Sequence, residues 1–158
     1  MIPASYIQAW SAKAPWPDAR QTEQDLIICR ALCDLFNAPA LKGKLAFRGG
    51  TAINKLLFQQ PLRYSEDIDL VQMEAAPIGA TVDAIREALS WLGKCRRDQA
   101  QHSMHLEFKF VPEADAQTTL KLKVEIKHAR AVEPVWNQVL SFRSGQRLVP
   151  GQDRNRVV

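Results

Sequence analysis

The chain has 158 residues, of which 46% are hydrophobic and 24% are charged, and its net charge is +4 at pH 7. This composition is typical of one globular domain, and it argues against a disordered chain, a coiled coil or a membrane protein. No apolar run is long enough to cross a bilayer, and the modest positive charge favours a polyanionic partner such as RNA.

The N-terminal residues show no basic region followed by an apolar stretch, so we expect a cytoplasmic protein without a secretory signal. The three cysteines lack the paired spacing of zinc ligands. Cys29 and Cys33 fall one turn apart in a predicted helix, and we expect reduced, mostly buried thiols.

Two helices are predicted before the first strand. Residues 4–12 suit a short helix, and a longer helix is predicted from Thr22 to about Asn37. Thr22 and Asp25 match the pattern of a helix N-terminus, and apolar residues follow at helical spacing. The short helix is predicted to place three bulky side chains on one face: Tyr6, Ile7 and Trp10.

A glycine pair follows the apolar run at residues 45–47, which we interpret as a buried strand. Gly49 and Gly50 allow a sharp turn and a close approach of the backbone to a ligand. Thr51 is placed as the N-cap of a helix that continues through residue 58. The N-terminus of this helix would offer backbone N–H groups to a phosphate.

The helix after the glycine pair is predicted to have an apolar side and a polar side. Ile53, Leu56 and Leu57 would form the core stripe because they recur at helical spacing. Asn54 and Lys55 are therefore expected to lie nearer to solvent or to a ligand.

Asp67 and Asp69 lie in a segment with the period-two alternation of a strand. Both carboxylates are therefore predicted on one face, about 6.5 to 7 Å apart along the strand, near enough to share or flank a metal ion. Phosphoryl and nucleotidyl transfer use carboxylates that hold Mg²⁺. An isolated Asp-x-Asp is most often a solvated strand edge, but the preceding glycine turn, Arg63 and Ser65 favour a functional site.

A helix is predicted at residues 81–92, and two strands with clean alternation follow at 104–110 and 120–127. We expect these strands to pair antiparallel. Glu125 lies on the polar face of the second strand and is the best candidate for a third acid of the site. The alternative is a solvated face on which Glu125 pairs with neighbouring lysines.

The pattern at residues 135–142 fits either a last strand or a short helix, and periodicity is lost from residue 143 on. We therefore predict one domain over residues 1–145, with N-terminal helices followed by a sheet. Residues 146–158 are predicted to form a disordered tail.

Two stretches, Phe-Arg-Gly-Gly-Thr-Ala at residues 47–52 and Arg-Tyr-Ser-Glu-Asp-Ile-Asp-Leu at 63–70, closely resemble the signature of the AbiEii/AbiGii nucleotidyltransferase toxins of abortive-infection systems. Residues 122–126, with Lys123 and Glu125, resemble the second motif of that family. The resemblance covers about residues 22–145. It implies an α/β (α+β) fold with a DNA polymerase β-like nucleotidyltransferase core, in which helices flank a mixed twisted sheet.

The resemblance also implies an activity. Members of this family resemble enzymes that use an NTP and Mg²⁺ to modify RNA, including tRNA acceptor ends, and thereby halt translation until a cognate antitoxin restrains them. The roles carried over by position are triphosphate binding for Gly49, Gly50 and Thr51, phosphate contact for Arg63 and Ser65, metal binding for Asp67 and Asp69, and nucleotide or metal binding for Lys123 and Glu125.

The chain departs from the family pattern after residue 145, where a Lys/Arg-rich helix and an Arg-Asp-x-x-Asp motif are expected and not found. We therefore expect a nucleotidyltransferase core without its helical C-terminal part. Two functions remain open: a nucleotidyltransferase toxin of a toxin–antitoxin and phage-defence system, or an inactive remnant that binds nucleotide, RNA or antitoxin. Apolar surface left uncovered by the missing helices would favour self-association.

Overall fold

The computed structural model describes residues 2–14, 16–58, 60–101 and 103–127. The expectations for residues 135–142 and for the C-terminal tail lie outside these described residues. Within them, no helix has the length and apolar character needed to span a membrane.

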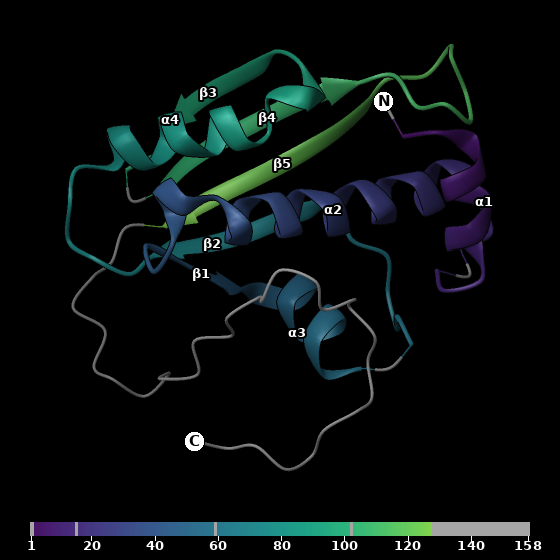
Figure 1. The fold of residues 1–158 in the computed structure, drawn as a ribbon, viewed down its shortest axis with the longest axis horizontal. Helices are drawn as coiled ribbons and strands as arrows, with labels where there is room; N and C mark the ends of the chain where they lie inside the picture. Colours follow the sequence, from purple (N-terminus) through teal and green to yellow (C-terminus); the bar gives the residue numbers. More distant parts are fainter. Residues whose placement is uncertain (1, 15, 59, 102, 128–158) are drawn as a thin grey trace.

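A mixed five-stranded sheet forms the centre of the molecule (Figure 1). β2 and β5 run parallel, and the other neighbouring strands pair antiparallel. The antiparallel pairing predicted for the two long strands, β4 and β5, is confirmed. In spatial order the strands are β1 (Leu45–Arg48), β2 (Asp67–Gln72), β5 (Leu120–Lys127), β4 (Ser103–Phe110) and β3 (Cys95–Gln99).

Helices flank this sheet, as expected from the sequence. α2 and α4 lie across one face of the sheet, α1 packs against α2, and α3 packs beside β1 and β2 (Figure 1). The helices are α1 (Ala4–Ser11), α2 (Ala19–Asn37), α3 (Gly49–Leu57) and α4 (Ile78–Ala88), with short 3₁₀ turns η1 (Pro39–Leu41) and η2 (Ser90–Leu92).

The hydrophobic core lies between the sheet and the helices α2 and α4. Strand alternation buries the even-numbered apolar residues of β2, β4 and β5 on this side, and each fully buried Leu or Ile stabilises the fold by about 1.5–3 kcal/mol. The opposite side, called the polar face below, carries the odd-numbered residues Asp67, Asp69, His105, Glu107, Lys109, Lys121, Lys123, Glu125 and Lys127.

α1 confirms the predicted short helix, but only part of its predicted face is buried. Ile7 is buried, and Trp10 Nε1–H donates a hydrogen bond to Asp25 Oδ2 at 2.9 Å. Tyr6 is 65% exposed, so its assignment to this face was wrong. Around the helix, residue 10 lies between residues 6 and 7, and the buried side of α1 is centred on Ile7, about 100° from residue 6.

α2 ends at Asn37 as predicted but begins at Ala19, so the predicted start at Thr22 was wrong. Asp18 is the N-cap, because its carboxylate accepts a hydrogen bond from the backbone N–H of Arg20 at 2.9 Å. Thr22 lies inside the helix and is buried, as is Asp25. The observed N-cap, Asp18, therefore lies four positions before the predicted helix start.

The segment between residues 78 and 99 differs from the prediction in two ways. α4 begins directly after Pro77 rather than at residue 81. The last part of the predicted helix is not α-helical but forms the 3₁₀ turn η2, after which Gly93 has a φ of +88°. The following strand, β3, was not predicted. It lies at the edge of the sheet, and four of its five residues are exposed, so no apolar alternation marks it.

α3 turns toward the protein the side that was predicted to lie nearer to solvent or to a ligand. Ile53 is 54% exposed and Leu57 is 73% exposed, whereas Asn54 is only 5% exposed. The Lys55 side chain is 9% exposed. The predicted core stripe was therefore wrong, because the inner side of α3 packs through specific polar contacts rather than through apolar ones.

Candidate functional site

The parallel pairing of β2 with β5 brings the two sequence motifs together on the polar face. Asp67 is in register with Lys123, and Asp69 is in register with Glu125. Residues in register on neighbouring strands have backbones about 4.8 Å apart and point to the same face. Four residues of the predicted site, separated by more than fifty positions in the sequence, therefore occupy one small area of the sheet.

Asp69 lies within a longer row of polar residues that crosses the sheet. Arg48 on β1 is in register with Asp69, and His105 on β4 is in register with Glu125. The side chain of His105 also forms a hydrogen bond of 2.8 Å with Ser103 Oγ. Sequence reasoning missed Arg48 and His105, because only the pairing of the strands reveals that they are neighbours of the acids.

The glycine pair at the start of α3 lies directly against the site. Gly49 has a φ of +78°, and a Cβ placed on it would collide with the Asp69 carboxylate. A Cβ on Gly50 would lie 2.6 Å from Nη2 of Arg63. The absence of side chains thus lets the first two residues of α3 lie against a carboxylate on one side and a guanidinium on the other.

Thr51 is not the N-cap of α3, as was predicted, because the helix already begins at Gly49 and Arg48 precedes it as the cap residue. Thr51 lies inside the first turn, is 1% exposed, and its hydroxyl donates a hydrogen bond to Asp67 Oδ1 at 3.3 Å. The threonine therefore joins α3 to the first aspartate of β2.

The loop between α3 and β2 is held by a side chain that the sequence did not single out as a loop anchor. Asn54 Nδ2 donates to the backbone carbonyl of Arg63 at 3.0 Å, and Asn54 Oδ1 accepts from the backbone N–H of Leu62 at 2.9 Å. In the same loop, Ser65 is 5% exposed and its hydroxyl has no hydrogen-bond partner among the described residues. A buried hydroxyl without a partner is rare and marks a position where a ligand or water can bind.

A buried ion pair anchors the C-terminal half of α3. Lys55 Nζ lies 2.8 Å from Asp25 Oδ1 and 3.3 Å from Cys29 Sγ, both on α2. Burial raises the pKa of the Cys29 thiol to about 11, so this thiol stays protonated near neutral pH. The three cysteines are free, which agrees with the reduced thiols expected from the sequence.

The carboxylates on the polar face repel one another. Burial, followed by the charges of Asp67 and Glu125, raises the pKa of the Asp69 carboxyl, and Arg48 and Lys127 oppose this rise. Such an excess of negative charge is what a bound divalent cation would neutralise.

The donor set fits Mg²⁺ bound together with a phosphate ligand. Mg²⁺ is usually held by one or two carboxylates, with substrate phosphates and water completing its coordination. Asp67 and Asp69 supply two such carboxylates on one face. Within the described part of the chain, no three or more His, Cys, Asp or Glu side chains form a group that could hold a metal ion, so a complete protein cage is absent there.

The two predicted site residues on β5 make no hydrogen bond or ion pair with the aspartates among the described residues. Glu125 Oε1 lies 3.5 Å from Lys127 Nζ, so its carboxylate has a lysine partner on its own strand. Lys123 is exposed, and no ion pair ties it to another described residue. Both residues are neighbours of the aspartates by strand register, and the charge of Glu125 also contributes to the raised pKa of Asp69.

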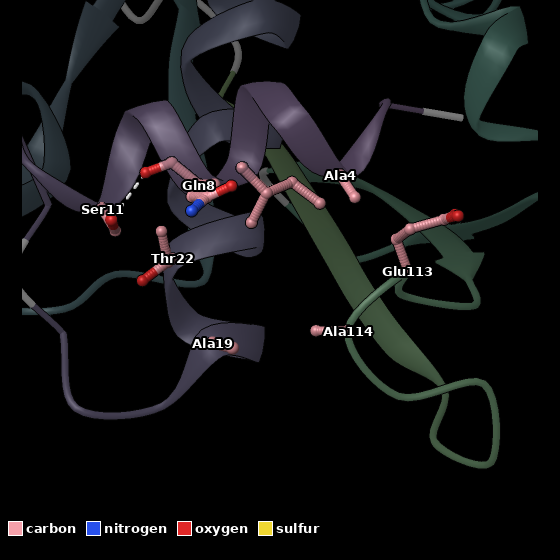
Figure 2. A pocket seen from close by; sticks show the side chains of 8 residues that line it. Ala4, Gln8, Ser11, Ala19, Thr22, Glu113 and Ala114 are labelled. Carbon is pink, nitrogen blue, oxygen red and sulfur yellow. Dashed lines mark hydrogen bonds between the residues drawn. The ribbon is translucent and has the colours of Figure 1, made fainter.

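A pocket of about 350 Å³ lies elsewhere, between α1, the start of α2 and the loop from β4 to β5 (Figure 2). Small and apolar side chains dominate its wall, and none of the predicted site residues lines it. Its lining residues are Ala4, Ile7, Gln8, Ser11, Ala19, Thr22, Glu113 and Ala114.

The chain matches the model of a known protein family. The family model described as "Nucleotidyl transferase AbiEii toxin, Type IV TA system" matches residues 30–150, a stretch that contains both motifs. No curated protein matches the chain significantly. Because the family model covers well over half of the 158 residues, the chain belongs to the AbiEii family of nucleotidyl transferase toxins from type IV toxin–antitoxin systems.

Proposed function

We propose that this protein transfers a nucleotide from an NTP to an acceptor RNA, with tRNA as the acceptor, in the presence of Mg²⁺. The observation that carries this proposal is the contact between the glycine turn of α3 and the Asp69 carboxylate. That contact sets a helix N-terminus, which favours phosphate, beside carboxylates, which favour a metal ion. Both parts of a metal–triphosphate complex thus have a matching partner.

The phosphate groups would bind at the start of α3. The backbone N–H groups of Gly50 and Thr51 belong to the first turn of that helix, whose N–H groups have no partner within the helix. Arg63 lies against Gly50 and would add a positive charge, and the unpaired hydroxyl of Ser65 would add a hydrogen bond.

The metal would bind at Asp67 and Asp69. These two carboxylates would hold Mg²⁺, which would supply positive charge to neutralise the phosphates during in-line attack. The hydrogen bond from Thr51 holds the Asp67 carboxylate in place. Glu125 and Lys123 would complete the site, with Glu125 near the metal and Lys123 near the nucleotide.

The reaction forms one phosphorus–oxygen bond and breaks another. A hydroxyl oxygen of the acceptor attacks the α-phosphorus, the bond between that phosphorus and the bridging oxygen breaks, and pyrophosphate leaves. The proton of the acceptor hydroxyl passes to the carboxylates of the polar face. As a toxin, the protein would disable its RNA target by this addition, and a cognate antitoxin would restrain it.

A second candidate function is binding without transfer, to an antitoxin or to a second copy of the chain. The observation that favours it is the exposed apolar side of α3 and its following loop, where Ile53, Leu57 and Leu62 are 54%, 73% and 68% exposed. Neighbouring exposed apolar side chains are typical of protein interfaces.

Incubation of the protein with each α-labelled NTP, Mg²⁺ and total tRNA tests the proposal. Label should move to tRNA with one or more of the four NTPs, and it should not move with Asp67→Ala, which removes a proposed metal ligand. Asp98→Ala, which removes an exposed aspartate from the edge strand β3, is the matched control and should leave transfer unchanged. Binding of nucleotide or tRNA without any transfer would instead support the second candidate function.

A further inference from the structure

The side chain of Asn54 binds the backbone of the loop that carries Arg63. Asn54 uses both ends of its amide on the loop from α3 to β2: it donates to the Arg63 carbonyl at 3.0 Å and accepts from the Leu62 N–H at 2.9 Å. The asparagine is 5% exposed, so these bonds form away from bulk water. A buried amide with both ends paired fixes the backbone to which it binds.

The backbone that Asn54 fixes is that of Arg63 itself. Arg63 is an exposed residue, and its guanidinium lies so close to Gly50 that a Cβ there would be 2.6 Å from Nη2. No ion pair with a carboxylate holds this guanidinium among the described residues. Holding an exposed arginine side chain in one place costs rotamer entropy. When its backbone is already fixed, fewer dihedral angles remain to be ordered, and the position of the guanidinium is better defined.

We infer that Asn54 is a positioning residue for nucleotide binding: it holds the loop so that the Arg63 guanidinium lies over the N-terminus of α3, where the triphosphate would bind. This inference rests on the proposed function, because it assigns to Arg63 a phosphate contact. Asn54 touches neither nucleotide nor metal, and its effect on the ligand passes through Arg63.

The chain offers a matched control in Gln72, at the opposite end of β2 from Asp67. Gln72 is 3% exposed, and its Nε2 donates to the carbonyls of Glu74 and Ala76 at 2.9 and 2.7 Å. It is thus a second buried amide that holds a loop after a secondary-structure element. Asn54→Asp and Gln72→Glu make the same chemical change, from amide to carboxylate, at two buried loop anchors. The two differ in that the Asn54 oxygen accepts a hydrogen bond, whereas the Gln72 oxygen has no partner among the described residues.

The experiment is a double-mutant cycle on nucleotide affinity. Titration calorimetry with each of the four NTPs and Mg²⁺, without acceptor, gives the dissociation constants of the wild type, Asn54→Asp, Arg63→Ala, the double variant and Gln72→Glu. The melting temperature of each variant is measured beside it. If Asn54→Asp shows no cooperative melting, Asn54→Ser takes its place in the same cycle.

Asn54→Asp should weaken binding about tenfold, a change of about 1.4 kcal/mol. In the Arg63→Ala background the same change should weaken binding less than about twofold, because residues that act through one another are not additive. Gln72→Glu should lower the melting temperature but leave the affinity unchanged.

Three results would overturn the inference alone: additive effects of Asn54→Asp and Arg63→Ala, an affinity that Asn54→Asp leaves unchanged, or an Arg63→Ala variant that binds as the wild type does. In each case binding by the wild type would still support the proposed function. If the wild type bound none of the four NTPs, the proposed function would fail together with the inference.

Discussion

At the scale of single residues, the site depends on a contact that only glycine permits. Gly49 combines a φ of +78° with a position at which a Cβ would meet the Asp69 carboxylate. Both conditions exclude an L-residue with a side chain, the first through backbone strain and the second through collision. The sequence predicted that the glycine pair and the aspartates belong to one site, but it did not reveal that Gly49 lies against the Asp69 carboxylate.

Gly49→Ala should therefore destabilise the fold by at least about 1–2 kcal/mol and should displace the Asp69 carboxylate. Thermal unfolding measures the first effect, and loss of Mg²⁺-dependent nucleotide binding measures the second. Gly79→Ala is the control, because Gly79 lies in the first turn of α4 with open space around it. This control should be neutral or stabilise the protein by up to about 1 kcal/mol. Equal behaviour of the two variants would contradict the contact.

Asp69→Asn should raise the melting temperature of the metal-free protein near neutral pH. Burial and the charges of Asp67 and Glu125 raise the pKa of the Asp69 carboxyl. A raised carboxyl pKa means that its contribution to stability is present in acid and is lost as the pH rises through the folded-state pKa. The gain from Asp69→Asn should thus appear at neutral pH and shrink in acid. A thermal-denaturation series in a metal chelator between pH 3 and pH 8 tests this, and a variant less stable than the wild type at pH 7 would contradict it.

At the scale of elements, α3 shows where sequence periodicity fails. Its apolar residues Ile53 and Leu57 are exposed, and its polar residues Thr51, Asn54 and Lys55 face inward. A hydrophobic pattern ranks residues by their cost of burial, and it has no information on hydrogen-bond partners that come from other parts of the chain. Each inward residue of α3 finds such a partner, on β2, on the following loop or on α2.

Lys55→Met should destabilise the protein by about 3–5 kcal/mol, because it leaves the Asp25 carboxylate buried and without its cation. The double variant Asp25→Asn/Lys55→Met should recover part of this loss. Ile53→Ala, on the neighbouring exposed position, should change stability by no more than about 0.5 kcal/mol. Urea denaturation measures these three variants and the single variant Asp25→Asn. A double variant as unstable as the sum of its single variants would contradict a direct pair.

The pKa of Lys55 sets the pH above which the ion pair between Lys55 and Asp25 is lost. Burial on its own would lower the pKa of Lys55, but Cys29, Asp25 and their hydrogen bonds outweigh it and the pKa is raised. A raised lysine pKa gives stability that is present at lower pH and is lost as the pH rises through it. The difference in stability between the wild type and Lys55→Met should therefore be full at neutral pH and should decline only in strong alkali.

At the scale of the whole molecule, the sheet order creates the site. β2 and β5 are neighbours although β3 and β4 lie between them in the sequence, and this crossover sets Asp69 beside Glu125. Alternation in the sequence was enough to predict β2, β4 and β5, because each buries one face. It could not predict the parallel register of β2 and β5, because register depends on contacts between strands and not on the pattern within one strand.

The edge strand β3 is a second feature that the pattern of apolar residues could not predict. Cys95 to Gln99 carry no apolar alternation, since four of the five residues are exposed at the sheet edge. Only pairing with β4 defines them as a strand. The sequence therefore predicted the centre of the fold and proposed the candidate site residues, whereas the neighbouring positions of Arg48 and His105 required the structure.

We propose that the glycine turn of α3 and the aspartates of β2 form a single site for metal and triphosphate. A crystal structure with an NTP and Mn²⁺ in place of Mg²⁺ tests it most directly, because the anomalous signal of manganese locates the ion. We predict an anomalous peak bound by Asp67 and Asp69, with the triphosphate at the N-terminus of α3. A metal ion or triphosphate bound elsewhere, with these two carboxylates uncoordinated, would contradict the claim.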